Sequence, residues 1–322
     1  MEALLNILKN VLIFIALAMP GYVLVKTKLL KTAESGALSK LLTYVGMPFL
    51  ILSSTINIEF TAEFTLTTVI TALVGIIITV LIVLLSAPIT TRNKNKDDVK
   101  SSKMRGIMRF AMAFSNNGFL GIPLAMAVFP DKPLVVSIVV ILNIITNIGI
   151  YTLGIYLISG DKSMMSAKKA LFNPVLIAFI LGLILNLIGA NKVIPEIAEY
   201  SAHLKNIVTP VSMIILGMKM ADIKLSSIFT SVSNYYVSAI KLIALPIIAT
   251  AIAFALTKIF NISTDLVLAF FVAFAMPTAG LASTLADNYG GDTENAVIYT
   301  LGTTVLSIIT IPLLYMLVTL IV

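Results

Sequence analysis

Cysteine and tryptophan are absent from this 322-residue chain, histidine occurs once, and charged residues make up only 11%. Without cysteine the chain forms no disulfides, iron–sulfur clusters or zinc ribbons, and it has no thiol nucleophile. A single histidine, His203, argues against a histidine-rich metal site and against a Ser-His-Asp triad. We therefore expect a protein that is not an enzyme, with no cofactor and no bound metal.

Hydrophobic residues make up 59% of the chain and the mean hydropathy is +1.05, whereas a soluble domain is about 45–50% apolar. One membrane span needs about 20 mostly apolar residues. The sequence thus predicts an all-α polytopic membrane protein with no room for a soluble catalytic domain. Continuous apolar runs predict ten transmembrane helices, at 4–25, 37–57, 64–91, 105–129, 133–159, 170–190, 196–220, 231–258, 264–287 and 293–321.

The chain has a net charge of +7, and its lysine and arginine residues are unevenly distributed among the predicted loops. In so apolar a protein, basic residues concentrate in cytoplasmic loops, and we attribute the excess to this rule rather than to nucleic-acid binding. The bias predicts a multi-pass protein of the plasma or inner membrane, surrounded by lipid, with both termini outside and no nucleic-acid partner. Five basic residues lie in the loops of one face: Lys9, Lys132, Lys192, Lys205 and Lys258. Fifteen lie on the other: Lys26, Lys28, Lys31, Lys40, Arg92, Lys94, Lys96, Lys100, Lys103, Arg105, Lys162, Lys168, Lys169, Lys219 and Lys224.

Similar proline motifs recur in the two halves of the chain. The segment V-G-M-P-F-L-I-L has a counterpart in V-T-P-V-S-M-I-I-L-G, and F-S-N-N-G-F-L-G-I-P-L has one in F-A-M-P-T-A-G-L-A-S. Five spans per half is an odd number, so two related halves enter the membrane from opposite sides. We expect an inverted repeat made of residues 1–160 and 161–322.

The second pair of motifs predicts two broken helices. Pro123 has no N–H and clashes with the preceding turn, and Gly118 and Gly121 tolerate non-helical backbone. Unpaired backbone groups at membrane depth are tolerated only against protein or a wet cavity, and a half-helix that begins there favours an anion. A plain proline kink is the alternative. Paired breaks are typical of secondary transporters that bind substrate near the midplane.

The motifs M-P-G-Y at 19–22, L-S-K-L-L-T-Y-V-G-M-P-F-L at 38–50, F-S-N-N-G-F-L-G-I-P-L at 114–124 and M-P-T-A-G-L-A-S at 276–283 resemble the auxin efflux carrier family. That family includes the plant PIN auxin carriers and bacterial permeases associated with malate, malonate and similar anions. The resemblance covers essentially the whole chain.

The resemblance implies a ten-helix fold related to bile-acid symporters and sodium/proton antiporters. In that fold helices 1, 2, 6 and 7 form a scaffold, and helices 3–5 and 8–10 form a moving transport unit. Helices 4 and 9 cross as broken helices. The long cytoplasmic loop of the plant carriers is missing, since about ten residues near 160–169 take its place.

Intramembrane amides and hydroxyls near the two breaks are the candidate substrate-binding groups. Asn116 and Asn117 offer donors and acceptors without a buried charge, and they are our first choice for contacting a carboxylate, with interhelical hydrogen bonding as the alternative. The other candidates at the first break are Gly118, Gly121 and Pro123. At the second break they are Pro277, Thr278, Ala279, Gly280 and Ser283.

Two polar stripes accompany the breaks. Asn143, Asn147 and Tyr151 follow at i, i+4 and i+8 in the fifth span, and Asn295, Tyr299, Thr303 and Ser307 repeat that spacing in the tenth. Each stripe occupies one helix face and should turn away from lipid. We include Asn143, Asn147, Thr303 and Ser307 as substrate-site candidates, although ordinary helix–helix hydrogen bonding explains the stripes equally well.

Lys241 lies near the middle of the eighth span, where an ammonium costs at least ~2.5–3.5 kcal/mol. It is the candidate electrostatic or coupling residue: it either attracts an anion, replaces a sodium ion or titrates during transport. The alternative is a lysine whose side chain reaches the membrane surface. Carboxylates fall near predicted helix ends, so coupling to protons or sodium stays open.

The leading hypothesis is a secondary active or facilitative transporter of small organic anions, carboxylates such as malate or auxin-like acids, working by alternating access at the crossing of helices 4 and 9. The alternatives are a cation-coupled symporter of a bile-acid-like or other solute, and a channel. Aligned pore-lining charges and a repeated filter sequence are absent. The sequence leaves assembly as a homodimer open.

The charge bias makes the topology testable, because the chain has no native cysteine. A single cysteine at Asp97→Cys should react with an impermeant thiol reagent only after the membrane is permeabilised. Labelling of intact cells from outside would reverse the assigned orientation.

Overall fold

The computed structural model describes residues 2–56, 61–90, 99–166, 168, 171–190, 196–221 and 225–322, and within these ranges the chain is helical with no strands beyond one isolated bridge. The predicted polytopic class is confirmed, because six helical stretches are long and apolar enough to cross a membrane: Thr32–Thr55, Ala62–Pro88, Pro133–Ser159, Glu199–Ala221, Val232–Phe260 and Thr293–Val318. Shorter apolar helices cover Ala16–Lys26, Asn117–Val128, Pro174–Leu187 and Asp265–Ala275.

The helices of the first half begin and end close to the predicted spans. They are α1 Glu2–Lys26, η1 Thr32–Glu34, α2 Ser35–Leu41, η2 Leu42–Gly46, α3 Met47–Thr55, α4 Ala62–Thr90, α5 Val99–Ala113, η3 Asn117–Gly121, α6 Ile122–Val128, α7 Pro133–Gly149, η4 Ile150–Gly154, α8 Ile155–Ser159 and η5 Lys162–Met164.

The second half, like the first, contains both long helices and interrupted ones. They are α10 Pro174–Leu187, α12 Glu196–Lys205, α13 Val208–Ala221, α14 Leu225–Thr230, α15 Val232–Ala239, η6 Ile240–Ala244, α16 Leu245–Phe260, α17 Asp265–Ala275, α18 Ala282–Asn288 and α19 Thr293–Val318. Several basic residues used for the topology prediction lie outside the described residues, namely Arg92, Lys94, Lys96, Lys169, Lys192 and Lys224, as does Asp97.

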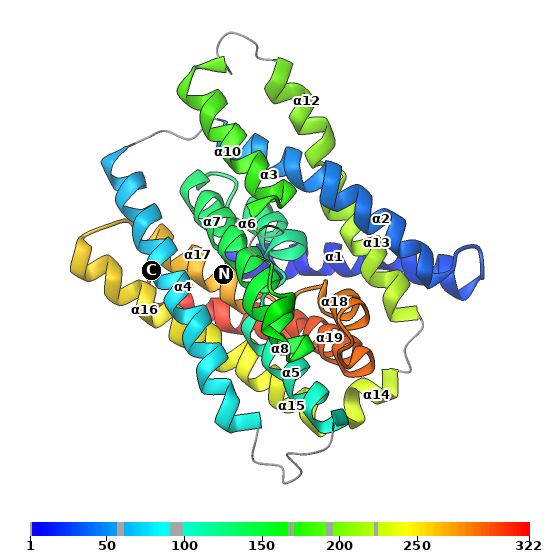
Figure 1. Ribbon diagram of the computed structural model, residues 1–322. Helices are drawn as coiled ribbons and strands as arrows, with labels where there is room; N and C mark the ends of the chain where they lie inside the picture. Colours follow the sequence, from blue (N-terminus) through cyan, green and yellow to red (C-terminus); the bar gives the residue numbers. More distant parts are fainter. Residues whose placement is uncertain are drawn as a thin grey trace.

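The helices pack as two groups (Figure 1). In the first helix group, α1 packs along α13, α3 packs against α10 and α12, and α2 contacts α13. The second helix group contains α4–α8 and α15–α19, in which α4 and α17 both pack on α7, and α5, α15 and α18 pack on α19. The groups meet chiefly where α1 touches α6 and α19, and where α13 touches η3.

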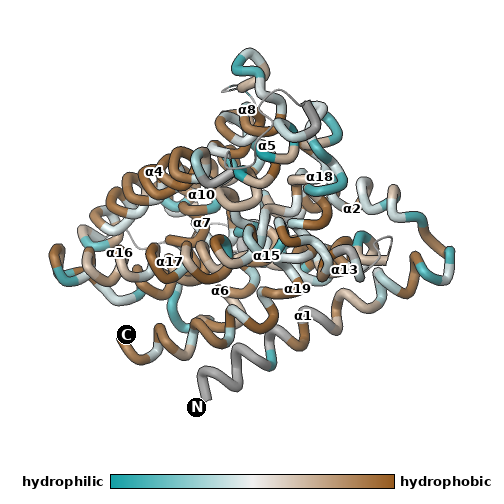
Figure 2. The backbone as a smooth tube through the Cα atoms, turned by 90° about the horizontal axis from the view of Figure 1, so that it is seen from below, coloured by the Kyte–Doolittle hydropathy of each residue, from teal (hydrophilic) through white to brown (hydrophobic). Residues whose placement is uncertain are grey.

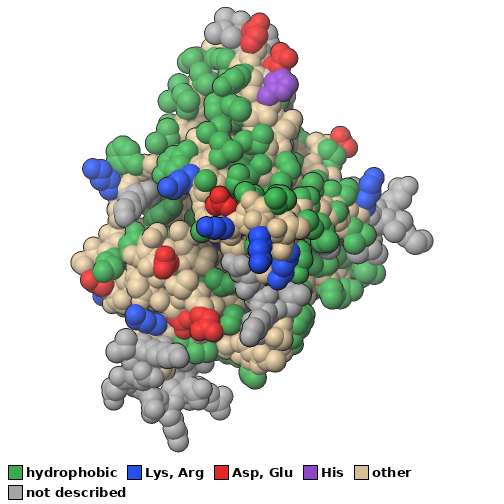
Figure 3. All heavy atoms as spheres, turned by 90° about the vertical axis from the view of Figure 1, so that its right-hand side faces the viewer, with side chains coloured by type: hydrophobic (Ala, Val, Ile, Leu, Met, Phe, Trp, Pro, Cys, Tyr) green, Lys and Arg blue, Asp and Glu red, His purple; other side chains and the backbone are tan. Residues whose placement is uncertain are grey.

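Large apolar side chains cover much of the outer surface. On α4, Leu73, Leu84 and Leu85 are between 58% and 62% exposed, and on α16 Ile259 is 72% exposed. Figure 2 shows the backbone of α4 mainly in hydrophobic colours, and Figure 3 shows hydrophobic side chains over much of one face of the molecule. Apolar patches of this extent are expected where lipid replaces water.

Glycines bring the helices of the first group into close contact. A Cβ atom at Gly21 of α1 would overlap the backbone carbonyl of Ile214, and one at Gly217 of α13 would overlap the carbonyl of Ala18. Small residues at such positions let membrane helices approach closely. Close van der Waals contact is a main source of packing energy in a membrane, because the hydrophobic effect does not drive helices together among lipid tails. The α1–α13 pair is therefore a tightly joined unit.

Alanine at these glycines should loosen the unit. We expect Gly217→Ala to lower the free energy of unfolding by about 1–3 kcal/mol, because overpacking forces the backbones apart. The measurement is thermal unfolding of the purified protein in detergent. Gly36→Ala is the matched control, because no atom lies within 4 Å of a Cβ built there. Equal melting temperatures for the two variants would contradict the close-packing interpretation.

Candidate functional site

Two helices are interrupted inside the molecule, and the interrupted segments meet each other. α5 ends at Ala113 and α17 ends at Ala275, and each is followed by a short extended segment. The amide N–H of Asn116 donates to the carbonyl oxygen of Pro277 at 2.8 Å, and that of Ala279 donates to the carbonyl of Phe114 at 2.9 Å. The two segments thus form an antiparallel bridge, centred on Ser115 and Thr278, that satisfies backbone groups freed by both breaks. We call this bridge the crossover.

The first break lies earlier than the sequence predicts. The chain opens at residues 114–116, whereas Pro123 lies inside the helical stretch Asn117–Val128, just after the π-helical turn η3. Pro277, in contrast, lies inside the second break, as expected. The expectation that the helix opens at Pro123 was therefore wrong by about two turns.

Pro123 still affects the site, because it cannot donate a hydrogen bond to the carbonyl group four residues earlier. An N–H at position 123 would donate to the carbonyl of Phe119, four residues earlier. That carbonyl instead accepts a hydrogen bond from the Ser212 hydroxyl of α13 at 3.2 Å. The proline thereby provides a polar contact between the two helix groups.

Widened π-helical turns precede three prolines. η2 is followed by Pro48, η3 by Pro123 and η6 by Pro246, each in the first turn of the next α-helix. The proline ring clashes with the carbonyl four residues earlier, and a turn with i→i+5 bonding relieves that clash. The turn η6 contains Lys241, so Pro246 helps to set the direction of this side chain.

Lys241 is fully buried behind the crossover. Its side chain is 0% exposed, and its Nζ donates to the hydroxyl of Ser115 at 2.5 Å. The alternative in which Lys241 reaches the membrane surface was wrong. In the part of the chain that the structure describes, Lys132 and Asp265 form the one ion pair, at 2.6 Å, so Lys241 has no carboxylate partner there.

Thr278 ties the crossover to two further helices. Its hydroxyl donates to the carbonyl of Ala111 in α5 at 3.0 Å, and its N–H donates to the Thr303 hydroxyl of α19 at 3.1 Å. The Thr303 hydroxyl in turn bonds carbonyls of its own helix. Both threonines are buried, so of the predicted site residues these two hold the crossover in place rather than face a cavity.

A small pocket lined by several amide and hydroxyl side chains, which we call the polar pocket, adjoins the crossover. Six predicted site residues line it: Asn116, Gly118, Asn143, Asn147, Ala279 and Gly280. Several other lining residues were not predicted as site residues, including Ser115, Thr146 and Thr43. Tyr151, which also lines the pocket, was predicted only as part of a polar stripe. Among the described residues that line this pocket none is acidic, which suits an anionic ligand.

The two neighbouring asparagines have different roles. Asn116 is half-buried, its backbone is bonded on both sides, and its side-chain amide has no protein partner within the described ranges. Asn117 is buried and donates to the Thr146 hydroxyl at 3.3 Å. Only Asn116 lines the polar pocket. Asn116 is therefore the amide that is free to bind a ligand.

Further amide groups on or next to the pocket wall have unused hydrogen-bonding capacity. The side chain of Asn147 donates to the side-chain oxygen of Asn143 at 3.1 Å. The Asn143 Nδ2 and the Asn117 Oδ1 are buried and lack protein partners. Because a buried polar group without a partner costs about 1–3 kcal/mol, these atoms are candidates for contact with water or a bound solute.

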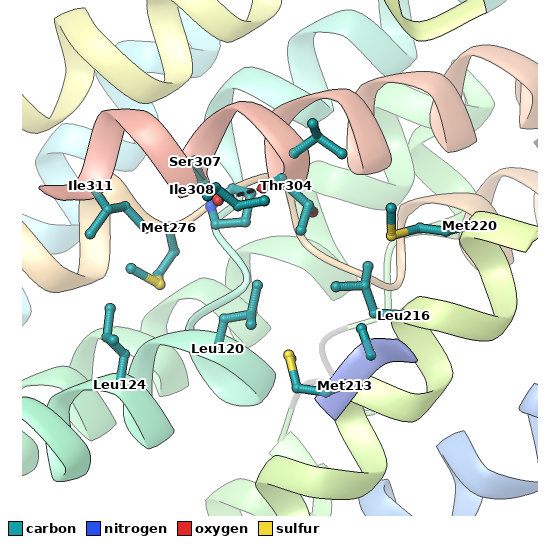
Figure 4. A pocket seen from close by; sticks show the side chains of 13 residues that line it. Leu120, Leu124, Met213, Leu216, Met220, Met276, Thr304, Ser307, Ile308 and Ile311 are labelled. Carbon is teal, nitrogen blue, oxygen red and sulfur yellow. Dashed lines mark hydrogen bonds between the residues drawn. The ribbon is translucent and has the colours of Figure 1, made fainter. Parts of the chain in front are cut away.

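An apolar pocket also adjoins the crossover, between α13, α19 and α6 (Figure 4). Its walls include Met213, Met220 and Met276. The hydroxyls of Thr304 and Ser307 also line it, but both donate to carbonyls of α19. Of the predicted site residues, Pro277 and Ser307 lie here.

The remaining predicted residues lie close to the crossover without lining either pocket. A Cβ atom at Gly121 would lie 3.2 Å from Met276, so this glycine permits close approach of the two broken segments. Ser283 lies in the first turn of α18. Asn295, from the second stripe, bonds Asp292 at the start of α19 and does not reach the crossover.

Burial of Lys241 without a carboxylate should cost stability. We expect Lys241→Met, which retains the length but removes the amine, to raise the free energy of unfolding by about 1–4 kcal/mol. Thermal unfolding in detergent measures the change. Lys258→Met is the control, because Lys258 is an exposed lysine near the end of the same helical stretch. A lower melting temperature for Lys241→Met than for the control would contradict this account.

Comparison with known proteins agrees with the motifs. A family model described as membrane transport protein matches residues 6–167 and 162–315. An uncharacterised transporter of Methanothermobacter thermautotrophicus is 28% identical over 309 residues, covering 95% of this chain and 96% of the relative. The chain therefore belongs to the membrane transport protein family, the family of the auxin efflux carriers.

Proposed function

We propose that this transporter moves small organic anions by alternating access, as a secondary active or facilitative carrier, with the substrate carboxylate in the polar pocket beside the crossover. The observation that carries the proposal is the free amide of Asn116 in a pocket whose described lining contains no acidic residue, beside a backbone bridge between two broken helices. Broken helices that meet at membrane depth favour binding of a polar solute there.

The proposal includes the architecture expected from the sequence. Residues 1–160 and 161–322 form two inverted five-helix repeats that make up ten spans of the cell membrane, with both termini outside. The first helix group acts as the scaffold and the second as the moving unit. This assignment is supported by the packing, because the crossover belongs wholly to the second group, whereas α13 of the first group faces it.

Lys241 supplies positive potential to the pocket without entering it. Ser115, which accepts its hydrogen bond, lines the pocket directly. An amine held behind the crossover stabilises an anion in front of it, because a charge interaction at a given distance is stronger in a low-dielectric interior than in water. We expect uptake to fall sharply in Lys241→Met and to be partly retained in Lys241→Arg.

Substitutions of the two asparagines should affect substrate binding differently. Asn116→Ala should weaken binding of the preferred carboxylate about ten- to a hundredfold, because an amide that pairs with a charged group contributes about 1.5–3 kcal/mol. Asn117→Ala should affect thermal stability more than affinity, since its amide already bonds Thr146. Binding to the purified protein is measured for acetate, malonate, malate and indole-3-acetate, with and without sodium.

Transport in proteoliposomes completes the test. Saturable counterflow of the bound carboxylate is the expected result and distinguishes a carrier from a channel. The proposal fails if no member of the panel binds the wild-type protein, or if Asn116→Ala and Asn117→Ala both keep wild-type affinity.

A further inference from the structure

Lys219 connects the two helix groups at the crossover. It lies in the last turn of α13, in the first group, and its side chain is half-buried. Its Nζ lies 3.4 Å from the carbonyl oxygen of Gly280, which belongs to the break after α17. From the sequence, this lysine was predicted only to lie in a cytoplasmic loop.

This contact leaves most of the bonding capacity of the amine unused. A distance of 3.4 Å is long for a charge-assisted hydrogen bond, which is typically about 2.7–2.9 Å. The acceptor is a neutral carbonyl, and no carboxylate lies within ion-pair distance of Lys219 in the described ranges. A half-buried cation with one weak neutral partner is a favourable site for an anion.

The free amide of Asn116 adjoins the same glycine. A Cβ atom built at Gly280 would lie 3.5 Å from the Nδ2 of Asn116. Asn116 and Gly280 both line the polar pocket, and Met220, the residue after Lys219, lines the apolar pocket. Lys219 itself is not among the described residues that line either pocket, but its amine contacts the carbonyl of Gly280, a residue of the polar pocket that adjoins Asn116.

We propose that Lys219 binds the substrate carboxylate directly from the first helix group, while the amide of Asn116 binds it from the second. The ammonium exchanges the carbonyl of Gly280 for a carboxylate oxygen, so the bound anion bridges the two groups. Lys241 has a different role, because its amine is already bonded to Ser115 behind the crossover. This inference rests on the proposed function and adds the residue that selects for the negative charge.

A charge-specific binding experiment tests the role of Lys219. The probes are acetate, malonate, malate and indole-3-acetate, each paired with its neutral amide. For the acid that binds wild type best, Lys219→Gln should lose about tenfold to a hundredfold in affinity, and Lys219→Arg should keep most of it. Affinity for the neutral amide should not change in either variant.

Lys26→Gln is the matched control. Lys26 lies in the last turn of α1, the packing partner of α13, and its exposed amine stacks on Tyr22 instead of contacting the crossover. The control should bind the acid like wild type. An equal loss of acid and amide binding in Lys219→Gln would assign this lysine a structural role and overturn the inference.

Chemical labelling gives a second measurement that needs no variant. In the wild-type protein, acylation of Lys219 by an amine-reactive reagent, quantified by mass spectrometry, should slow when the best-binding acid is present and not when its amide is present. Unchanged labelling would count against the inference. If Asn116→Ala loses acid binding but Lys219→Gln keeps it, the role of Lys219 is rejected and the proposed function stands. If wild-type protein binds no acid, the proposed function is rejected as well.

Discussion

The two backbone hydrogen bonds between Asn116 and Pro277 and between Ala279 and Phe114 are the interaction on which the rest of the site depends. A helix that stops inside a membrane leaves N–H and C=O groups that lipid cannot satisfy, at a cost of several kcal/mol each. Two breaks that pair with one another remove much of this cost. Each break is therefore sustainable only in the presence of the other.

The pairing also fixes the direction of the neighbouring side chains. Ser115 and Asn116 both line the polar pocket, and the Ser115 hydroxyl also accepts the hydrogen bond of Lys241. The threonine of the opposite segment, Thr278, is held by α5 and α19. The crossover thus adjoins both the polar pocket and the apolar pocket, which is lined in part by methionines.

Much of the fold could be predicted from the sequence, because long apolar runs report membrane helices directly. The proline and glycine motifs also located both breaks to within about two turns. The exact opening at 114–116 could not be predicted, since a π-helical turn accommodates a proline inside a helix and η3 precedes Pro123. The sequence likewise predicted that only one of Asn116 and Asn117 faces the cavity on a regular helix, but it could not decide which one, since that depends on the backbone at the break.

Lys219 illustrates a different limit of sequence analysis. Its place at the end of an apolar run is indistinguishable from that of Lys26 or Lys258, which are exposed. Only the approach of the break after α17, more than fifty residues later in the chain, gives Lys219 its contact with Gly280. A lysine at a helix end becomes part of a site through tertiary packing that local sequence does not contain.

The glycine contacts between α1 and α13 have a mechanical consequence. Carbonyl oxygens occupy the places where Cβ atoms would otherwise stand at Gly21 and Gly217, so the two backbones interlock and resist sliding past each other. The contacts from α13 to the crossover are single hydrogen bonds, from Ser212 to Phe119 and from Lys219 to Gly280. Shear within the molecule therefore concentrates at the surface between the two helix groups, which is the surface that contains both pockets.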